Sequence, residues 1–251
     1  MTAAQAQSAA IGFGIARWRA WTPGVAEEAD WAGWLDGRVS GSADDQPRVD
    51  YLPPLLRRRL DRMGRMALHT AWFCAEGLDE FEVVFGSRHG SLGRTADLLA
   101  DLARGEPLSP SAFSLAVHNS VAGLFSIARG NRCRATAMAA GLDTLGMSLL
   151  EGASLVAEGA QHVIVTYAED RPPPLYESLV AAPQTHPFAI SLLLTRQADA
   201  PLQCSLAPVA PSAGEPREEP EVALVRFLVE GPQAAVVGVD QPWRLERCAH
   251  G

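Results

Sequence analysis

The sequence lacks the segments that would place a chain in or across a membrane. It contains no run of about eighteen apolar residues, so a membrane-spanning helix is not expected. Residues 1–10 are small and polar, without the basic stretch that opens a secretory signal, so the cytoplasm is the expected location. The formal net charge of −8 disfavours nonspecific binding to nucleic acid or anionic membranes.

The sequence also has few features of a metal or redox site. Its four cysteines, at positions 74, 133, 204 and 248, lie far apart and form no CxxC pair. Its six histidines include no HExxH motif and no spaced cluster. No metal and no cofactor are therefore predicted.

What is present is an alternation of strand and helix patterns. Hydrophobic residues make up 47% and charged residues 20%, which is typical of a globular chain. Apolar runs of strand length are interleaved with segments in which apolar residues recur every three or four positions. The expected strands are 11–15, 81–85, 134–137, 162–167 and 188–194, and the expected helices are 31–35, 53–76, 92–103, 119–130 and 138–158. This order predicts an α/β layered domain.

Residues 197–251 differ in composition from the rest. Residues 207–220 are rich in proline and acidic residues and are expected to form a loop. Pro220 begins a helix over 220–230, and two closing strands follow. We predict that this segment packs on the same domain as residues 1–196.

Several short motifs occur in a fixed order along the first part of the chain. Ser109-Pro110 is followed by Val117-His118-Asn119-Ser120-Val121-Ala122-Gly123 and then by Gly130-Asn131-Arg132. Thr136-Ala137-Met138-Ala139-Ala140-Gly141-Leu142 comes next, and Gly86-Ser87-Arg88-His89-Gly90 lies upstream. From about 11 to 196 the chain resembles the N-terminal half of the β-ketoacyl synthases, in the thiolase superfamily. The resemblance implies a thiolase-like half-fold with a mixed sheet packed by helices.

The resemblance places Met138 where the family has its cysteine nucleophile. A thioether has no proton to lose and cannot form the acyl-enzyme, so no catalytic residue is assigned. The family also uses two histidines from the second half of its duplicated fold, and nothing after Arg196 resembles that half. His186 lies in a proline-flanked loop and His250 at the terminus. We therefore expect a noncatalytic protein.

The resemblance also implies a partner. Family dimers form through the strand before the nucleophile, which here comprises Arg132, Cys133, Arg134 and Ala135, and through the adjacent segment 109–119. The chain is most similar to the half-length chain-length-factor subunit of aryl polyene (xanthomonadin-type) pigment biosynthesis. Its expected partner is a full-length β-ketoacyl-ACP synthase, whose acyl tunnel it would help to wall. The candidate tunnel or interface residues are Phe113, Leu115, His118, Asn119, Thr136 and Met138.

Two alternatives remain open at this point. Ser87 or Ser148 could serve an independent acyl-thioester hydrolase or acyltransferase. The chain could instead be a docking scaffold that binds acyl carrier protein through four arginines, although a solvated helix face is the plainer reading of such a run. The four are Arg57, Arg58, Arg62 and Arg65. For Asn119, the plainer reading is a helix N-cap whose side chain accepts a backbone N–H.

Overall fold

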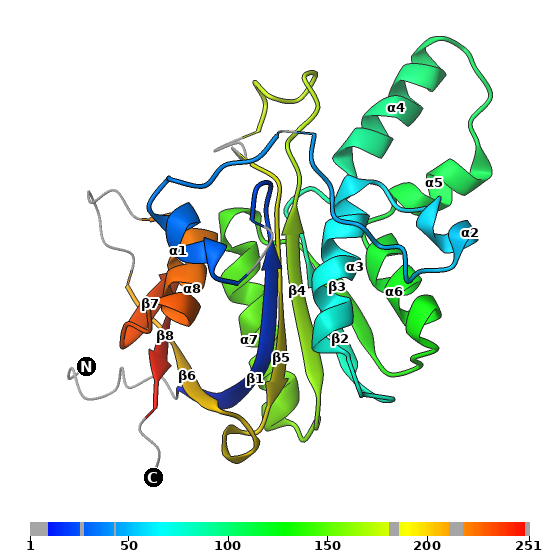
Figure 1. Ribbon diagram of the computed structural model, residues 1–251. Helices are drawn as coiled ribbons and strands as arrows, with labels where there is room; N and C mark the ends of the chain where they lie inside the picture. Colours follow the sequence, from blue (N-terminus) through cyan, green and yellow to red (C-terminus); the bar gives the residue numbers. More distant parts are fainter. Residues whose placement is uncertain (1–9, 26–27, 43, 181–185, 211–217, 249–251) are drawn as a thin grey trace, which may run out of the picture.

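A single eight-stranded sheet runs through the described part of the chain, in the order β3-β2-β4-β5-β1-β6-β8-β7 (Figure 1). The computed structural model describes residues 10–25, 28–42, 44–180, 186–210 and 218–248. The strands are Ile11–Trp21 (β1), Glu82–Gly86 (β2), Ala135–Met138 (β3), Val163–Glu169 (β4), Phe188–Thr195 (β5), Leu202–Pro208 (β6), Ala234–Val237 (β7) and Trp243–Arg247 (β8).

The sheet is parallel at one end and antiparallel elsewhere. Strand β2 pairs in parallel with both β3 and β4, so the carboxyl ends of these three strands meet at one edge. The remaining pairs are antiparallel. Every residue of β4 and β5 is buried, which explains why both strands are nearly continuous apolar runs in the sequence.

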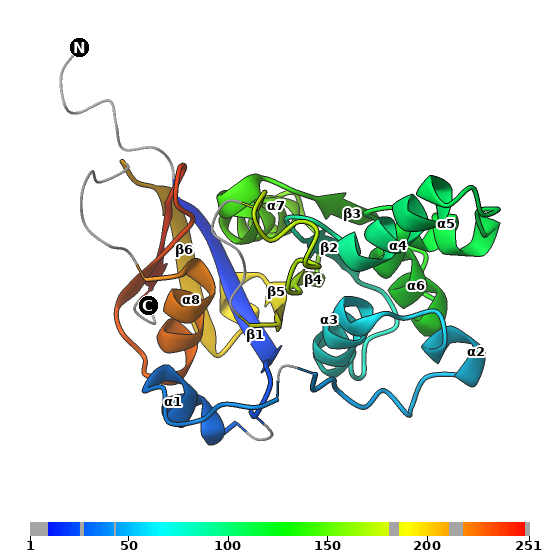
Figure 2. The same ribbon diagram turned by 90° about the horizontal axis from the view of Figure 1, so that it is seen from above.

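Helices cover both faces of the sheet. They are Asp30–Leu35 (α1), Pro54–Arg57 (α2), Arg62–Cys74 (α3), Leu92–Ala103 (α4), Pro110–Ala116 (α5), Ser120–Arg129 (α6), Thr144–Ala157 (α7) and Pro220–Val229 (α8). Helices α3 and α6 lie on one side and α7 on the other (Figure 2). Each side has its own hydrophobic core, one built with α7 and α8 and one with α3 and α6. The predicted α/β layered fold is confirmed.

The expected helix over residues 53–76 is wrong in one respect, because two helices occupy this range. Helix α2 ends at Arg57, and α3 begins after Asp61, whose carboxylate accepts a hydrogen bond from the Gly64 N–H at 2.8 Å. An aspartate in extended conformation caps a new helix and cannot continue the old one. The apolar periodicity did not reveal this break, because it continues across it.

Two further expectations near helix starts are corrected. The helix expected to begin at Met138 starts at Thr144, after a 3₁₀ turn at Gly141–Asp143 (η2), and Met138 is the last residue of β3. Asn119 does stand at the N-cap position of α6, but its side chain makes no capping hydrogen bond. Helix α6 ends as expected at Gly130, whose φ of 66° is left-handed and therefore favours glycine.

The C-terminal segment extends the same sheet across residue 196. Strand β6, which was not predicted, pairs with β1, and the expected closing hairpin is present as β7 and β8. Helix α8 packs beside β7 and α7. Part of the expected loop, residues 211–217, lies outside the described residues, as does His250.

Among the described helices, no single one is long and apolar enough to cross a membrane. Helices α5 and α6 would reach that length and composition together, but they are bent by 98° relative to each other.

Candidate functional site

The candidate site lies at the carboxyl ends of the three parallel strands. In the sheet register Gly86 stands between Met138 on β3 and Tyr167 on β4, and Glu169 follows two residues later. Ligands of open α/β sheets bind beyond the carboxyl ends of the strands. At this edge of the sheet, Met138 therefore lies beside the start of the turn that joins β2 to α4.

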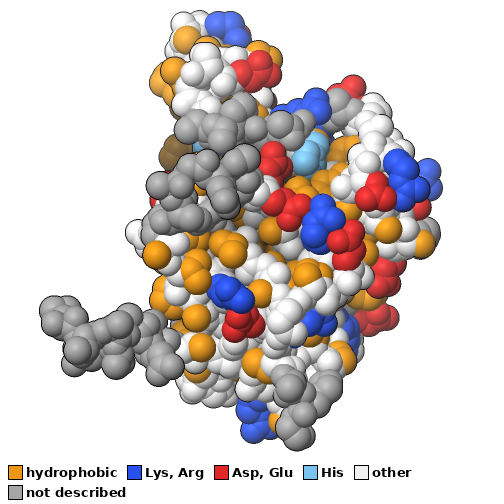
Figure 3. Space-filling view, turned by 90° about the vertical axis from the view of Figure 1, so that its left-hand side faces the viewer, with side chains coloured by type: hydrophobic (Ala, Val, Ile, Leu, Met, Phe, Trp, Pro, Cys, Tyr) orange, Lys and Arg blue, Asp and Glu red, His pale blue; other side chains and the backbone are white. Residues whose placement is uncertain are grey.

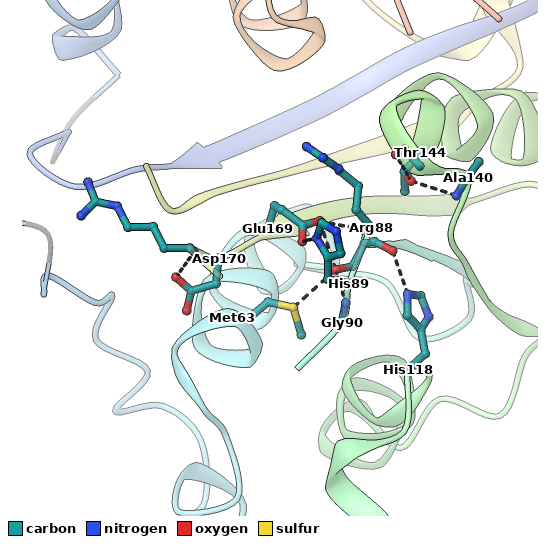
Figure 4. A network of polar contacts seen from close by, with 12 residues as sticks. Met63, Arg88, His89, Gly90, His118, Ala140, Thr144, Glu169 and Asp170 are labelled. Carbon is teal, nitrogen blue, oxygen red and sulfur yellow. Dashed lines mark hydrogen bonds and ion pairs between the residues drawn. The ribbon is translucent and has the colours of Figure 1, made fainter. Parts of the chain in front are cut away.

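A buried carboxylate organises that turn (Figure 4). Glu169 is 1% exposed and accepts hydrogen bonds from the Arg88 N–H at 2.6 Å and the Ser87 hydroxyl at 3.3 Å. His89 Nδ1 lies 3.1 Å from Glu169 Oε1, which is within hydrogen-bond distance. Polar groups of three consecutive residues thus surround the Glu169 carboxyl group, as a buried polar group requires. Glu169 thus fixes the start of the turn.

His118 holds the same turn from the other side. Its Nε2 lies 2.8 Å from the carbonyl oxygen of Ser87, and its ring lies 6.0 Å from that of Phe85. Gly90 has a left-handed φ of 61°, and a Cβ there would lie 3.2 Å from the His118 ring. His118 therefore has a positioning contact with the turn, and the close approach favours glycine at position 90.

A cavity of about 440 Å³ opens beside this turn. Asp170 forms a two-point ion pair with Arg62 at its wall, with distances of 2.6 and 3.0 Å. His89, Arg94, Asp61 and Asp97 also line the cavity, so its wall carries both carboxylates and arginines. None of the six candidate tunnel residues lines this cavity. In the described residues, no group of three or more histidine, cysteine, aspartate or glutamate side chains could hold a metal ion.

Met138 is half-buried and packs against the core on the α7 side of the sheet. Its carbonyl oxygen accepts a hydrogen bond from the Ser87 N–H at 3.2 Å, which links it to the Glu169 turn. The next turn is closed by Thr144, whose hydroxyl accepts from the Ala140 N–H and donates to the Gly141 carbonyl. A thioether in this position can fill space or contact an apolar chain, but it supplies no nucleophile.

The N-terminus of α7 already carries a carboxylate of the protein. Asp143 is buried and accepts hydrogen bonds from three consecutive backbone N–H groups, of Val239, Asp240 and Gln241, at 2.6, 2.9 and 3.0 Å. The β7–β8 loop is thereby tied to the start of α7.

The remaining tunnel candidates lie on different elements and differ in burial. Phe113, on α5, is 62% exposed, whereas Leu115 on the same helix packs against the core on the α3 side. Thr136 is half-buried on β3, and Asn119 precedes α6. Of the six, His118 and Met138 are hydrogen-bonded to Ser87.

The expected dimer strand starts later than predicted. Strand β3 begins at Ala135, so Arg132, Cys133 and Arg134 lie in the segment before it. Arg134 forms ion pairs with Glu82 and Glu158. Strand β3 stands at the end of the sheet and pairs with β2 alone within the described chain.

The four docking arginines do not form one free surface. Arg57 pairs with Asp50 at 2.7 Å, and Arg62 is held by Asp170. Arg65 donates to the carbonyl oxygen of Arg57. Among these four arginines, Arg58 is exposed and the other three are half-buried.

The two candidate nucleophilic serines are fully buried. The Ser87 hydroxyl is engaged with Glu169 and the Gly90 N–H, and the Ser148 hydroxyl donates to the Thr144 carbonyl of its own helix. Neither is arranged as an activated nucleophile, which needs exposure and a base within reach.

Sequence reasoning missed Glu169, His89 and Asp143. The position of Glu169 was detectable, since an acidic pair directly follows the buried run at 163–168, where strand ends carry function. The role of Asp143 had no such signal, because its partners lie almost a hundred residues away.

Comparisons with known proteins agree with this geometry. A chain of the ketosynthase ApeO in complex with its chain length factor ApeC, from Xenorhabdus doucetiae, is 27% identical with a TM-score of 0.79. The match covers 94% of this chain and 99% of that one. The ishigamide ketosynthase/chain length factor matches at 18% identity and a TM-score of 0.64, over 86% of this chain and 72% of that one.

A third structure is a type II acyl-carrier protein in complex with its ketosynthase (AntDE:AntF), at 15% identity and a TM-score of 0.59. That match covers 81% of this chain and 71% of the other. Among curated proteins none matches. Residues 31–244 match the family described as "Beta-ketoacyl synthase, N-terminal domain". The chain therefore belongs to the β-ketoacyl synthase N-terminal domain family, with the mixed α/β fold of the thiolase-like ketosynthases.

Proposed function

We propose that this protein is a noncatalytic, chain-length-factor-like subunit that pairs with a complete β-ketoacyl-ACP synthase in the cytoplasm. The heterodimer would elongate chains of the polyene or fatty-acid type, as in aryl polyene pigment formation. Two of the similar structures are ketosynthase and chain length factor assemblies, and another contains a carrier protein, which supports both partners.

The observation that carries this proposal is an unfilled sheet edge surrounded by exposed apolar side chains. Strand β3 ends the sheet, α6 contacts β3, and α5 contacts α6. Phe113 and Val117 in and after α5, and Ile127 on α6, are exposed, the last by 70%. An open strand edge beside an apolar surface favours association with another protein.

The backbone at this edge is oriented for strand pairing. Val83 and Ser87 of the β2 side donate to the carbonyls of Arg134 and Met138. Alternate residues of a strand point their peptide groups to opposite sides, so the N–H groups of Ala135 and Ala137 face the free edge. A partner strand can bind there without disturbing β2.

The proposed lack of catalysis rests on position 138. Met138 has no ionisable proton and cannot accept an acyl group. A cysteine at position 138 would still lack the two histidines that the family takes from its second half, which nothing after Arg196 resembles.

We further propose that Met138 and Phe113 limit the length of the partner's acyl chain. Met138 packs against the core on the α7 side but is only half-buried, and Phe113 is exposed on α5, so both side chains can contact a partner. Either side chain would exclude added methylenes by sterics, since overpacking costs about 1–3 kcal/mol.

The interface is tested by co-expression with a ketosynthase that has the cysteine and both histidines. We expect a 1:1 complex, and its loss in the Phe113→Asp/Ile127→Asp variant, because both charges would be buried. Leu179→Asp is the matched control, since Leu179 is 74% exposed but lies in the loop after Pro174. Equal retention of all variants in the complex would reject this surface.

The chemistry is tested by mass spectrometry of the isolated chain after incubation with an acyl-carrier thioester. Neither the natural chain nor Met138→Cys should gain an acyl group, and a covalent adduct on either would refute the noncatalytic assignment. In the reconstituted pair, Phe113→Ala or Met138→Ala should lengthen the product. An unchanged product from an intact heterodimer would exclude the tunnel role.

A further inference from the structure

The turn between β2 and α4 has the form of an anion-binding loop, a feature that the proposed function does not use. Gly86, Gly90 and Gly93 recur as the chain passes from the end of β2 into α4. Helix α4 is 12 residues long, and its first turn lines the cavity of about 440 Å³ beside the Ser87 turn. A glycine-bearing loop that leads from a parallel strand into a helix is a common binding site for phosphate groups. The local fold therefore suits a negatively charged ligand.

A buried hydroxyl at this helix start has no partner. Ser91 is the N-cap residue of α4 and is only 6% exposed, yet its side chain makes no capping hydrogen bond. No other group in the described part of the chain bonds this hydroxyl. Buried polar side chains almost always have a hydrogen-bond partner. Because Ser91 lines the cavity, its free hydroxyl points to a group that binds there.

Other donors at the start of α4 are also unfilled. The first backbone N–H groups of a helix have no partner inside it, and the Ser91 side chain does not cap those of Gly93 and Arg94. Apart from its own helix, no described atom would lie within 4 Å of a Cβ placed on Gly93, so a ligand can approach this backbone. The Arg94 Nη2 donates to the Arg59 carbonyl at 3.0 Å, but its Nε is buried without a hydrogen bond, 3.8 Å from the Asp61 carboxylate.

Most acceptors around the cavity are already engaged. Arg62 holds Asp170 in a two-point contact, and the Asp61 carboxylate caps α3. Glu169 is surrounded by polar groups of the turn that begins at Ser87. Unfilled donors at the start of α4 therefore face engaged acceptors, so the cavity favours a ligand that accepts hydrogen bonds.

A second cavity, on the α8 side, offers a contrast. It measures about 480 Å³ and is lined by Arg226 and Arg244. Arg226 is paired with both Glu218 and Glu230, and Arg244 with Glu246. Figure 3 shows acidic and basic side chains side by side on this face. The arginines of the second cavity are neutralised locally, so it is the unfilled donors, and not size, that distinguish the cavity at α4.

We propose that the start of α4 binds the phosphate group of a small molecule. The donors are the Ser91 hydroxyl, the backbone N–H groups of Gly93 and Arg94, and the Arg94 guanidinium. A phosphate group carries several acceptor oxygens, so it can accept from all of these donors at once. The cavity has the volume of a small-molecule site and leaves room for the rest of the molecule. Every donor belongs to this chain, so the site does not depend on pairing with a ketosynthase.

The test titrates the full chain with inorganic phosphate, methyl phosphate and acetate by isothermal titration calorimetry at constant ionic strength. We expect one saturable site per chain, with a Kd for phosphate on the order of 1 mM and weaker binding of acetate. Ser91→Ala should weaken phosphate binding about fivefold, through loss of a neutral hydrogen bond. Arg94→Gln should weaken it about tenfold or more, because a charge-assisted contact is lost.

A further variant tests the sign of the charge. Asp97 lines the cavity one turn after Arg94, so Asp97→Asn should strengthen phosphate binding about twofold or more. A gain in affinity cannot come from a damaged fold. Asp101→Asn, Arg104→Gln and Ser114→Ala are matched controls outside the cavity, and each should change the affinity less than twofold. Thermal unfolding of every variant shows whether its fold is retained.

Several results would overturn the proposal. They are phosphate heats that do not saturate, affinity within twofold of the natural chain in both Ser91→Ala and Arg94→Gln, and weaker binding in Asp97→Asn. Acetate that binds as tightly as phosphate would overturn the assignment of the ligand as a phosphate. Methyl phosphate that binds more than tenfold more weakly than inorganic phosphate would exclude a phosphate ester.

Discussion

Removing the Asp143 carboxylate should detach the β7–β8 hairpin from the start of α7. Asp143 accepts three backbone N–H groups of the loop at 2.6–3.0 Å and is only 6% exposed. A hydrogen bond to a charged group contributes about 1.5–3 kcal/mol, and an orphaned buried donor costs about 1–3 kcal/mol. Val239 and Asp240 are exposed enough for water to replace part of the loss.

For Asp143→Ala we therefore expect the free energy of unfolding to fall by about 3–4 kcal/mol, less than the sum of three separate bonds. At about 2–4 °C per kcal/mol for a chain of this size, the midpoint Tm should fall by roughly 10 °C. Asp143→Asn keeps one acceptor oxygen but turns an amide N–H toward a backbone donor, so an intermediate loss of about 1–2 kcal/mol is expected.

Urea denaturation followed by circular dichroism measures these losses. Asp240→Ala is the matched control, because Asp240 lies in the same loop with its side chain exposed, and its loss should stay within about 0.5 kcal/mol. A fall of less than 1 kcal/mol for Asp143→Ala would refute the reasoning. It would mean that packing of Val237 and Trp243 against the core, not the carboxylate, holds the hairpin.

Two further predictions concern titratable groups. Burial and Arg19 lower the pKa of His69, so the unfolded chain binds more protons below about pH 6.5, and stability should fall as the pH falls. In urea titrations at pH 7.5 and 5.5, His69→Gln should reduce this loss; an unchanged pH slope would contradict the assignment. Burial raises the pKa of Cys74 and Cys204 to about 12, whereas Cys133 and Cys248 are half-buried. Iodoacetamide at pH 8 should therefore modify no more than two cysteines in the folded protein, and peptide mapping that finds Cys74 alkylated would show that α3 opens.

The layered fold was predictable because local patterns and burial agree over most of the chain. The runs that form β4 and β5 are apolar throughout because both faces of these strands are covered. The break between α2 and α3 was not predictable from periodicity. The apolar residues keep the same spacing on both sides of Asp61, although Asp61 caps a new helix. Strand β6 was missed because its buried and more exposed residues alternate over only part of its length. Its formation also depends on pairing with β1, which is distant in the sequence.

At the site, sequence alone gives the side chain at each position, including the methionine at 138 that the resemblance aligns with the family's cysteine, and it predicts no nucleophile there. That conclusion needs no coordinates, because a thioether has no ionisable proton wherever it lies. The tertiary structure alone decided which groups act together. It brought Glu169 and His118 into contact with the turn that carries Ser87 and His89, and it placed Asp143 in contact with a loop almost a hundred residues away. Such groupings arise from sheet register and helix packing, which depend on contacts between residues distant in the chain.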